Sequence, residues 1–139
     1  MVFWRDHTRT ISATRVVEAV VAGINDRDFT ALGQIVADDV SYIDSMGGCV
    51  TGRANALLLL DRLIAYDPGF RIHLKEVTPH NNFVLAIGYT VGDRQETAER
   101  TLLRLLIEDG VMAEWRSYSA DNPRPVVQML MGSHSRVSA

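Results

Sequence analysis

The chain of 139 residues has the length of one domain, and its 47% hydrophobic and 22% charged residues are typical of an ordinary globular protein. A net charge of −3 with scattered basic residues argues against a nucleic-acid partner, and the single cysteine, Cys49, excludes an internal disulfide. No apolar run reaches the roughly 20 residues that cross a bilayer, and residues 1–7 are too polar for a signal-peptide core, so we expect a cytoplasmic protein without membrane contact.

The N-terminal region has the pattern of an amphipathic helix. Apolar residues recur at three- and four-residue spacing from Val16 to Ile24, with charged residues between them. We expect this helix to begin near Ser12, with Ser12 or Thr14 as its N-cap. The turn-forming side chains of 25–28 end it.

A short helix, a strand and a longer helix are expected next. The apolar spacing predicts a helix over 29–36, and 40–44 has the pattern of a short strand. Gly47 and Gly48 indicate a loop. Thr51 is a candidate cap for a third helix with an apolar stripe over 57–64.

The C-terminal half has the pattern of an antiparallel meander. The expected strands are 70–77, 83–91, 97–107 and 111–119. The residues between them are turn formers, including Asp109 and Gly110, so each connection is a hairpin. Helices followed by such a meander predict an α+β fold.

The end of the chain contains one more apolar piece. The spacing of Val126, Val127, Leu130 and Met131 predicts a short helix over 125–131 that packs on the domain near a cavity mouth or a dimer edge. We expect mobile residues after Gly132. The predicted organisation is an N-terminal extension over 1–12, one domain over 13–122, and a partly disordered tail over 123–139.

Four segments carry a resemblance to a known family. They are Asn25-Asp26-Arg27-Asp28-Phe29, Ala37-Asp38-Asp39-Val40-Ser41-Tyr42-Ile43-Asp44, Thr51-Gly52-Arg53 and Glu114-Trp115-Arg116-Ser117-Tyr118. Together they resemble the SnoaL-like, or nuclear transport factor 2-like, superfamily, which includes ketosteroid isomerases and limonene epoxide hydrolases. The resemblance implies three N-terminal helices on a strongly curved antiparallel sheet, a cystatin-like roll with a cone-shaped cavity.

Asp44 and Tyr42 are the candidate catalytic residues. Asp44 matches the position of the proton-shuttling aspartate in ketosteroid isomerases, and a carboxylate in an apolar pocket can act as a base at carbon. If Asp44 faces the cavity, strand alternation places Tyr42 there too, as a hydrogen-bond donor to a ligand oxygen. The alternatives are that Asp44 accepts bonds in the loop that follows it, and that Tyr42 is a core aromatic residue.

The remaining positions of the known enzymes are not reproduced. Val20 and Leu103 stand where the isomerases have their oxyanion donors, and neither side chain can donate a hydrogen bond. The charged set of the epoxide hydrolases falls at Gly88, Thr90 and Ser117. The resemblance therefore implies neither known mechanism. The expected ligand contacts are Val20, Leu103, Trp115 and Ser117.

Two functions stay open. The first is binding of a small apolar molecule, polyketide-, terpene- or steroid-like, with isomerisation or cyclisation by proton transfer and Asp44 as base. The second is a non-catalytic ligand-binding or dimerisation module of the same fold. The four histidines show no paired spacing and Gly47-Gly48 lacks a phosphate-loop pattern, so we expect no metal and no cofactor.

A homodimer is the expected assembly. Helices that cover one face of the sheet leave the other face partly bare, and an exposed apolar patch tends to be an interface. Alternation assigns Leu102, Leu106 and Tyr118 to this outer face, beside Arg104 and Arg116. We expect a two-fold dimer through the sheet.

Overall fold

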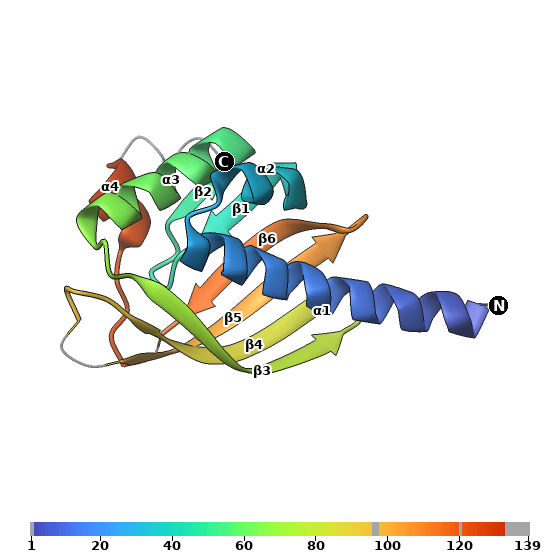
Figure 1. The fold of residues 1–139 in the computed structure, drawn as a ribbon. Coiled ribbons are helices and arrows are strands. Elements are labelled where there is room, and N and C mark those ends of the chain that lie inside the picture. The colour runs from blue at the N-terminus through green and yellow to red at the C-terminus, as the bar shows by residue number, and fades with distance from the viewer. Residues whose placement is uncertain (1, 96–97, 120, 133–139) are drawn as a thin grey trace.

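The computed structural model describes residues 2–95, 98–119 and 121–132. The elements in chain order are α1 (Val2–Asp26), α2 (Phe29–Ile35), β1 (Val36–Ile43), β2 (Cys49–Thr51), α3 (Arg53–Tyr66), β3 (Arg71–His80), β4 (Phe83–Val91), β5 (Glu99–Glu108), β6 (Val111–Tyr118) and α4 (Val126–Met131). Helices α1, α2 and α3 lie over one face of the curved sheet, and α4 lies beside α3 at one end (Figure 1). No helix in the described ranges is long and apolar enough to span a bilayer.

The sheet has the strand order β2-β1-β6-β5-β4-β3. The strands from β3 to β6 pair antiparallel with their sequence neighbours, so the predicted meander and the α+β fold class are confirmed. β1 joins β6 in parallel and pairs β2 antiparallel. This arrangement places β1, β6, β5 and β4 side by side, with their inner faces toward the helices.

The first helix begins earlier than expected. α1 starts at Val2 and continues through the segment that we expected to be an extension, so Ser12 and Thr14 lie inside the helix and not at its N-cap. The apolar periodicity weakens before Ala13, but residues 2–12 contain no proline or glycine to stop a helix. The pattern predicted α1 from Ser12 onward and missed its start.

Two boundaries around β1 and α3 also differ from the expectation. Val36 begins β1 and does not end α2, because its β-branched side chain is buried on the strand. The N-cap of α3 is Gly52, with a φ of 99° and no side-chain cap, while Thr51 ends β2. β2 was not predicted because three residues are too few to show alternation.

The predicted C-terminal helix is confirmed. α4 spans Val126–Met131, and its Val127 is fully buried against the domain. Arg62 of α3 donates from Nη1 to the Leu130 carbonyl at 2.9 Å. The residues expected to be mobile, 133–139, lie outside the described residues.

The core is divided into two clusters. The larger lies between α1, α2 and the inner face of the sheet and includes Val17, Leu32, Val84 and Leu105. The smaller consists of Val50, Leu59 and Val127, and so joins β2, α3 and α4. Tyr42 packs against both clusters, which places it at the junction between the main core and the C-terminal helix.

Candidate functional site

A cavity of about 150 Å³ lies between the helices and the inner face of the sheet. Its wall consists of Val20, Ile24, Leu32, Val36, Val40, Ser41, Tyr42, Ala56, Leu57, Leu59, Leu60, Leu63, Phe70, Ile72, Thr90, Thr101, Leu103, Met112, Trp115, Ser117 and Val126. Among the described residues no charged side chain lines it. Such a wall suits an apolar molecule, because a bound charge would lose its hydration without a partner.

Hydroxyl groups cross one end of this wall. Tyr42 comes from β1, Ser117 from β6, Thr101 from β5 and Thr90 from β4, on adjacent strands. On β5, Thr101 lies between the partners of the other two residues. Ser117 pairs with Leu103, two residues after Thr101, and Thr90 pairs with Glu99, two residues before it. Because residues two apart share a face, the pairing sets these four residues in a diagonal row; a fifth hydroxyl-bearing residue on the wall is Ser41 of β1. The cavity is thus apolar on its helical side and has a row of hydroxyl-bearing residues across the sheet.

Three of the polar side chains form a hydrogen-bonded chain. Trp115 Nε1 donates to Ser117 Oγ at 2.9 Å, and the Ser117 side chain is hydrogen-bonded to the Tyr42 hydroxyl. The indole N–H, the Ser117 hydroxyl and the Tyr42 hydroxyl supply three donor hydrogens for these two bonds. Within the described residues neither hydroxyl has another side-chain or backbone bond, so one hydroxyl hydrogen is left for a molecule in the cavity.

The Tyr42 phenol keeps its proton. Burial away from water raises the pKa of Tyr42 above its ordinary value, the nearby charge of Asp44 raises it further, and the hydrogen bond with Ser117 offsets part of this rise. At neutral pH the phenol is therefore a donor.

Asp44 lies outside the cavity wall, although we expected it to face the cavity. Its Oδ1 accepts from the backbone N–H groups of Met46 at 2.9 Å and Gly48 at 2.8 Å, and its Oδ2 accepts from the Val127 N–H at 2.9 Å. The side chain is 2% exposed. β1 ends at Ile43, so the alternation that holds for Tyr42 does not extend to Asp44. The carboxylate closes the β1–β2 turn and binds the start of α4.

The other sequence-predicted site residues lie together on the wall. Tyr42, Val20, Leu103, Trp115 and Ser117 all line the cavity, and their contact with a ligand stays a prediction.

Three hydroxyl-bearing wall residues, Ser41, Thr90 and Thr101, were not predicted as site residues, and neither was Val126 of α4. Thr101 could have been found from its place two residues before Leu103 on the same strand face. Val126 belongs to the segment that we expected near a cavity mouth or a dimer edge, and the structure places it on the cavity wall.

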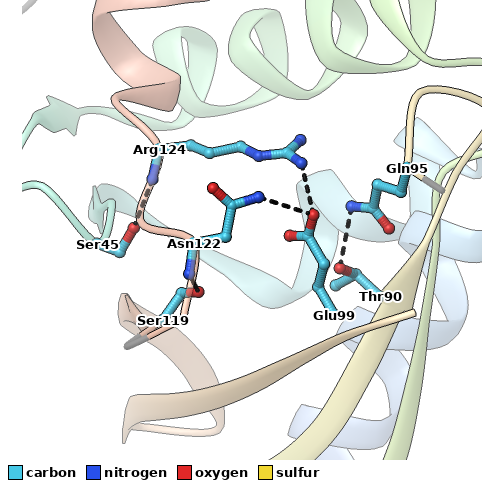
Figure 2. Close-up of polar contacts among 7 residues, drawn as sticks. All are labelled: Ser45, Thr90, Gln95, Glu99, Ser119, Asn122 and Arg124. Atoms are coloured by element: carbon cyan, nitrogen blue, oxygen red, sulfur yellow. Dashed lines mark hydrogen bonds and ion pairs between the residues drawn. The ribbon is translucent and has the colours of Figure 1, made fainter. Parts of the chain in front are cut away.

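A polar cluster lies at the hydroxyl-lined end (Figure 2). Glu99 Oε1 accepts from Arg124 Nη2 at 2.5 Å and from Asn122 Nδ2 at 3.1 Å. Gln95 Nε2 donates to the hydroxyl of the wall residue Thr90 at 3.3 Å. Arg124 also donates its backbone N–H to Ser45 Oγ at 3.1 Å. The cluster thus connects the start of β5 to the segment that precedes α4.

A family model described as the SnoaL-like domain matches residues 17–116. The chain belongs to the SnoaL-like family. The match covers α1 from Val17, all of α2 and α3, and the sheet as far as Arg116 of β6, so the predicted family is confirmed. No curated protein matches the sequence.

Solved structures share the fold of this SnoaL-like domain. A protein provisionally assigned as a polyketide cyclase from Sinorhizobium meliloti is 17% identical, with a TM-score of 0.69 over 74% of this chain and 93% of the other. An LEH-like epoxide hydrolase of M. tuberculosis is 21% identical, with a TM-score of 0.70 over 79% of this chain and 84% of the other. A protein provisionally assigned as a ketosteroid isomerase from Kribbella flavida is 18% identical, with a TM-score of 0.68 over 87% of this chain and 88% of the other. At these identities the likeness is one of fold.

Within the described part of this SnoaL-like domain, no group of three histidine, cysteine or acidic side chains is placed to hold a metal ion. What the wall offers a ligand is apolar surface and hydroxyl donors.

Proposed function

We propose that this SnoaL-like domain binds a small, uncharged, largely apolar molecule that carries one hydrogen-bond acceptor oxygen. The observation that carries the proposal is an apolar cavity whose Trp115–Ser117–Tyr42 chain leaves one hydroxyl hydrogen without an acceptor. A carbonyl oxygen satisfies that hydrogen, while the rest of the ligand contacts the apolar wall.

The size of the cavity limits the ligand. A dry apolar cavity of about 150 Å³ is known to accept benzene, so the space in this structure suits a compound of about one ring. A steroid or a fused polyketide would require the wall to move. Monocyclic carbonyl compounds are therefore the first class to screen.

Catalysis with Asp44 as base is the alternative, and the closeness of Asp44 to Tyr42 favours it. The charge of Asp44 raises the pKa of Tyr42, which supports a short separation between the carboxylate and the hydroxyl that we propose binds the ligand. To act as a base, however, Asp44 would have to give up hydrogen bonds that both of its oxygens now accept from backbone N–H groups. We therefore put binding first and isomerisation or cyclisation second.

A matched pair of ligands tests the proposal. Acetophenone and ethylbenzene have nearly the same shape, and only the first has an acceptor oxygen. The wild-type protein should bind both, and Tyr42→Phe/Ser117→Ala, which removes both hydroxyls, should lower the ratio of acetophenone to ethylbenzene affinity by about fivefold, the value of one hydrogen bond. NMR titration measures both affinities.

Thr101→Val is the control, because it removes a wall hydroxyl outside the Trp115–Ser117–Tyr42 chain. Its affinity ratio should stay at the wild-type value. Failure of both compounds to bind the wild-type protein would contradict the binding function itself. An unchanged ratio in the double variant would contradict the role of the hydroxyls alone.

We also infer that the outer face of the sheet is the interface of a homodimer. Its large apolar side chains are each 38–43% exposed: Leu85, Ile87, Leu102 and Tyr118. Ile87 pairs with Leu102, which pairs with Tyr118, so the patch crosses three strands without a gap. Arg104 and Glu114 form an ion pair on the same face.

Leu102→Glu should convert the dimer to a monomer, because it places a charge at the centre of the patch. Leu58→Glu is the control, since Leu58 is similarly exposed on α3, away from the sheet. Light scattering at micromolar concentration measures the mass. A wild-type monomer, or dimers in both variants, would overturn the inferred interface.

A further inference from the structure

We propose that Glu99 is a positioning residue that holds residues 122–131 over the cavity and thereby sets how fast a ligand enters and leaves. We call residues 122–131 the C-terminal strap. The inference rests on the proposed binding function. It is carried by the bonds between the strap and the rest of the domain.

The strap forms part of the cavity wall. Val126, the first residue of α4, lines the cavity, and Val127 is buried against Val50 and Leu59. A Cβ on Gly48 would lie 2.7 Å from Asp44 Oδ2 and 3.1 Å from Val127 Cβ, so the β1–β2 turn and α4 approach as closely as a glycine permits. Displacement of α4 therefore opens the wall at Val126.

The strap has little stability of its own. α4 has six residues, and an isolated helix of that length does not persist in water. Its fully buried apolar side chain is Val127, which belongs to the smaller core cluster. Its attachment therefore depends on the packing of Val127 and of the partly buried Val126, Leu130 and Met131, together with a few polar bonds. Such short segments open well before the whole domain unfolds.

The polar bonds come from three parts of the domain. The β1–β2 turn contributes Asp44 and Ser45, which accept from the backbone N–H groups of Val127 and Arg124. Helix α3 contributes Arg62, which donates to the Leu130 carbonyl. The third part is the sheet, which contributes Glu99.

Glu99 makes the attachment to the sheet. It opens β5 and shares a strand face with Thr101 and Leu103, both on the cavity wall. The side chains of Arg124 and Asn122 converge on one of its carboxylate oxygens (Figure 2). Arg124 and Glu99 are 33% and 23% exposed, so the pair is partly shielded from solvent. The bonds of Glu99 hold the strap without requiring contact between Glu99 and the ligand.

Glu99→Gln tests the proposal, with Glu114→Gln as the matched control. Both substitutions remove a carboxylate that pairs with an arginine: Glu99 pairs with Arg124 of the strap, and Glu114 of β6 pairs with Arg104 of β5. The Arg104–Glu114 pair lies on the outer face of the sheet, away from the strap. The first readout is amide hydrogen exchange at 126–132. The second is acetophenone exchange, measured from NMR line shapes of the Trp115 indole and other wall signals.

Glu99→Gln should speed amide exchange at 126–132, and should raise both the association and the dissociation rate constants about three- to tenfold, while the affinity changes by less than about twofold. Exchange in β3, β4 and β6 should stay at wild-type rates, which shows that the domain is folded. Glu114→Gln should leave both readouts unchanged.

Three results would overturn the proposal. Unchanged amide exchange in α4 would show that Glu99 does not hold the strap. Faster amide exchange with unchanged ligand kinetics would show that the ligand passes elsewhere. A faster dissociation rate alone, with weakened affinity, would make Glu99 a ligand contact. If the wild-type protein binds no acetophenone, the proposed function fails, while the amide exchange still decides whether Glu99 holds the strap.

Discussion

Replacement of Asp44 by alanine should lower the free energy of unfolding by about 3 kcal/mol, because three backbone N–H groups lose a buried, charged acceptor. The loss should be localised. The β1–β2 turn loses the acceptor for Met46 and Gly48, and α4 loses the acceptor for Val127. Denaturant unfolding gives the total change, and amide exchange should show the largest increases at these three positions.

Asp44→Asn should separate the two parts of this effect. Its amide oxygen can replace Oδ1 and keep the turn, but its NH₂ group cannot accept from Val127, so the loss should be smaller and concentrated in α4. Asp39→Ala is the control, since Asp39 is exposed on β1. Alanine at position 44 with unchanged or higher stability would contradict the structural role and would favour the catalytic one, in which an apolar site strains the carboxylate.

Val20→Phe should abolish most ligand binding, because the added ring occupies the space of a single-ring ligand. Val20 is 1% exposed and lines the cavity from α1. We expect acetophenone and ethylbenzene affinities to fall at least about tenfold together, with a change in stability of about 1–3 kcal/mol at most because the cavity receives part of the ring. NMR titration and thermal unfolding measure the two quantities.

Ala19→Phe is the matched control, one residue along α1 on its exposed side. It adds a larger side chain to the same helix without reaching the cavity, so both affinities should stay at the wild-type values. Unchanged affinity in Val20→Phe would show that the ligand binds outside the cavity. A loss of both affinities in Ala19→Phe would show an effect transmitted through the helix and would remove the support for this site.

The sequence by itself determined the elements whose pattern is long enough to read. The three-four spacing of Val16, Val17, Val20 and Val21 defined the buried face of α1, and alternation in β5 separated Leu103 from Leu102. The same alternation correctly assigned Leu102 and Tyr118 to the outer face of the sheet. Each of these features depends on residues that are close in the sequence, so the periodic spacing of apolar residues is enough to predict it.

The tertiary structure decided which segments far apart in the sequence contact one another. The role of Asp44 depends on where β1 ends and on the N–H of Val127, 83 residues later. The hydrogen-bonded chain of Trp115, Ser117 and Tyr42 requires the parallel pairing of β1 with β6, and Glu99 finds its partners only after the tail returns to the sheet. No local periodicity encodes such contacts, because their free energy appears only when the strands and the tail have come together.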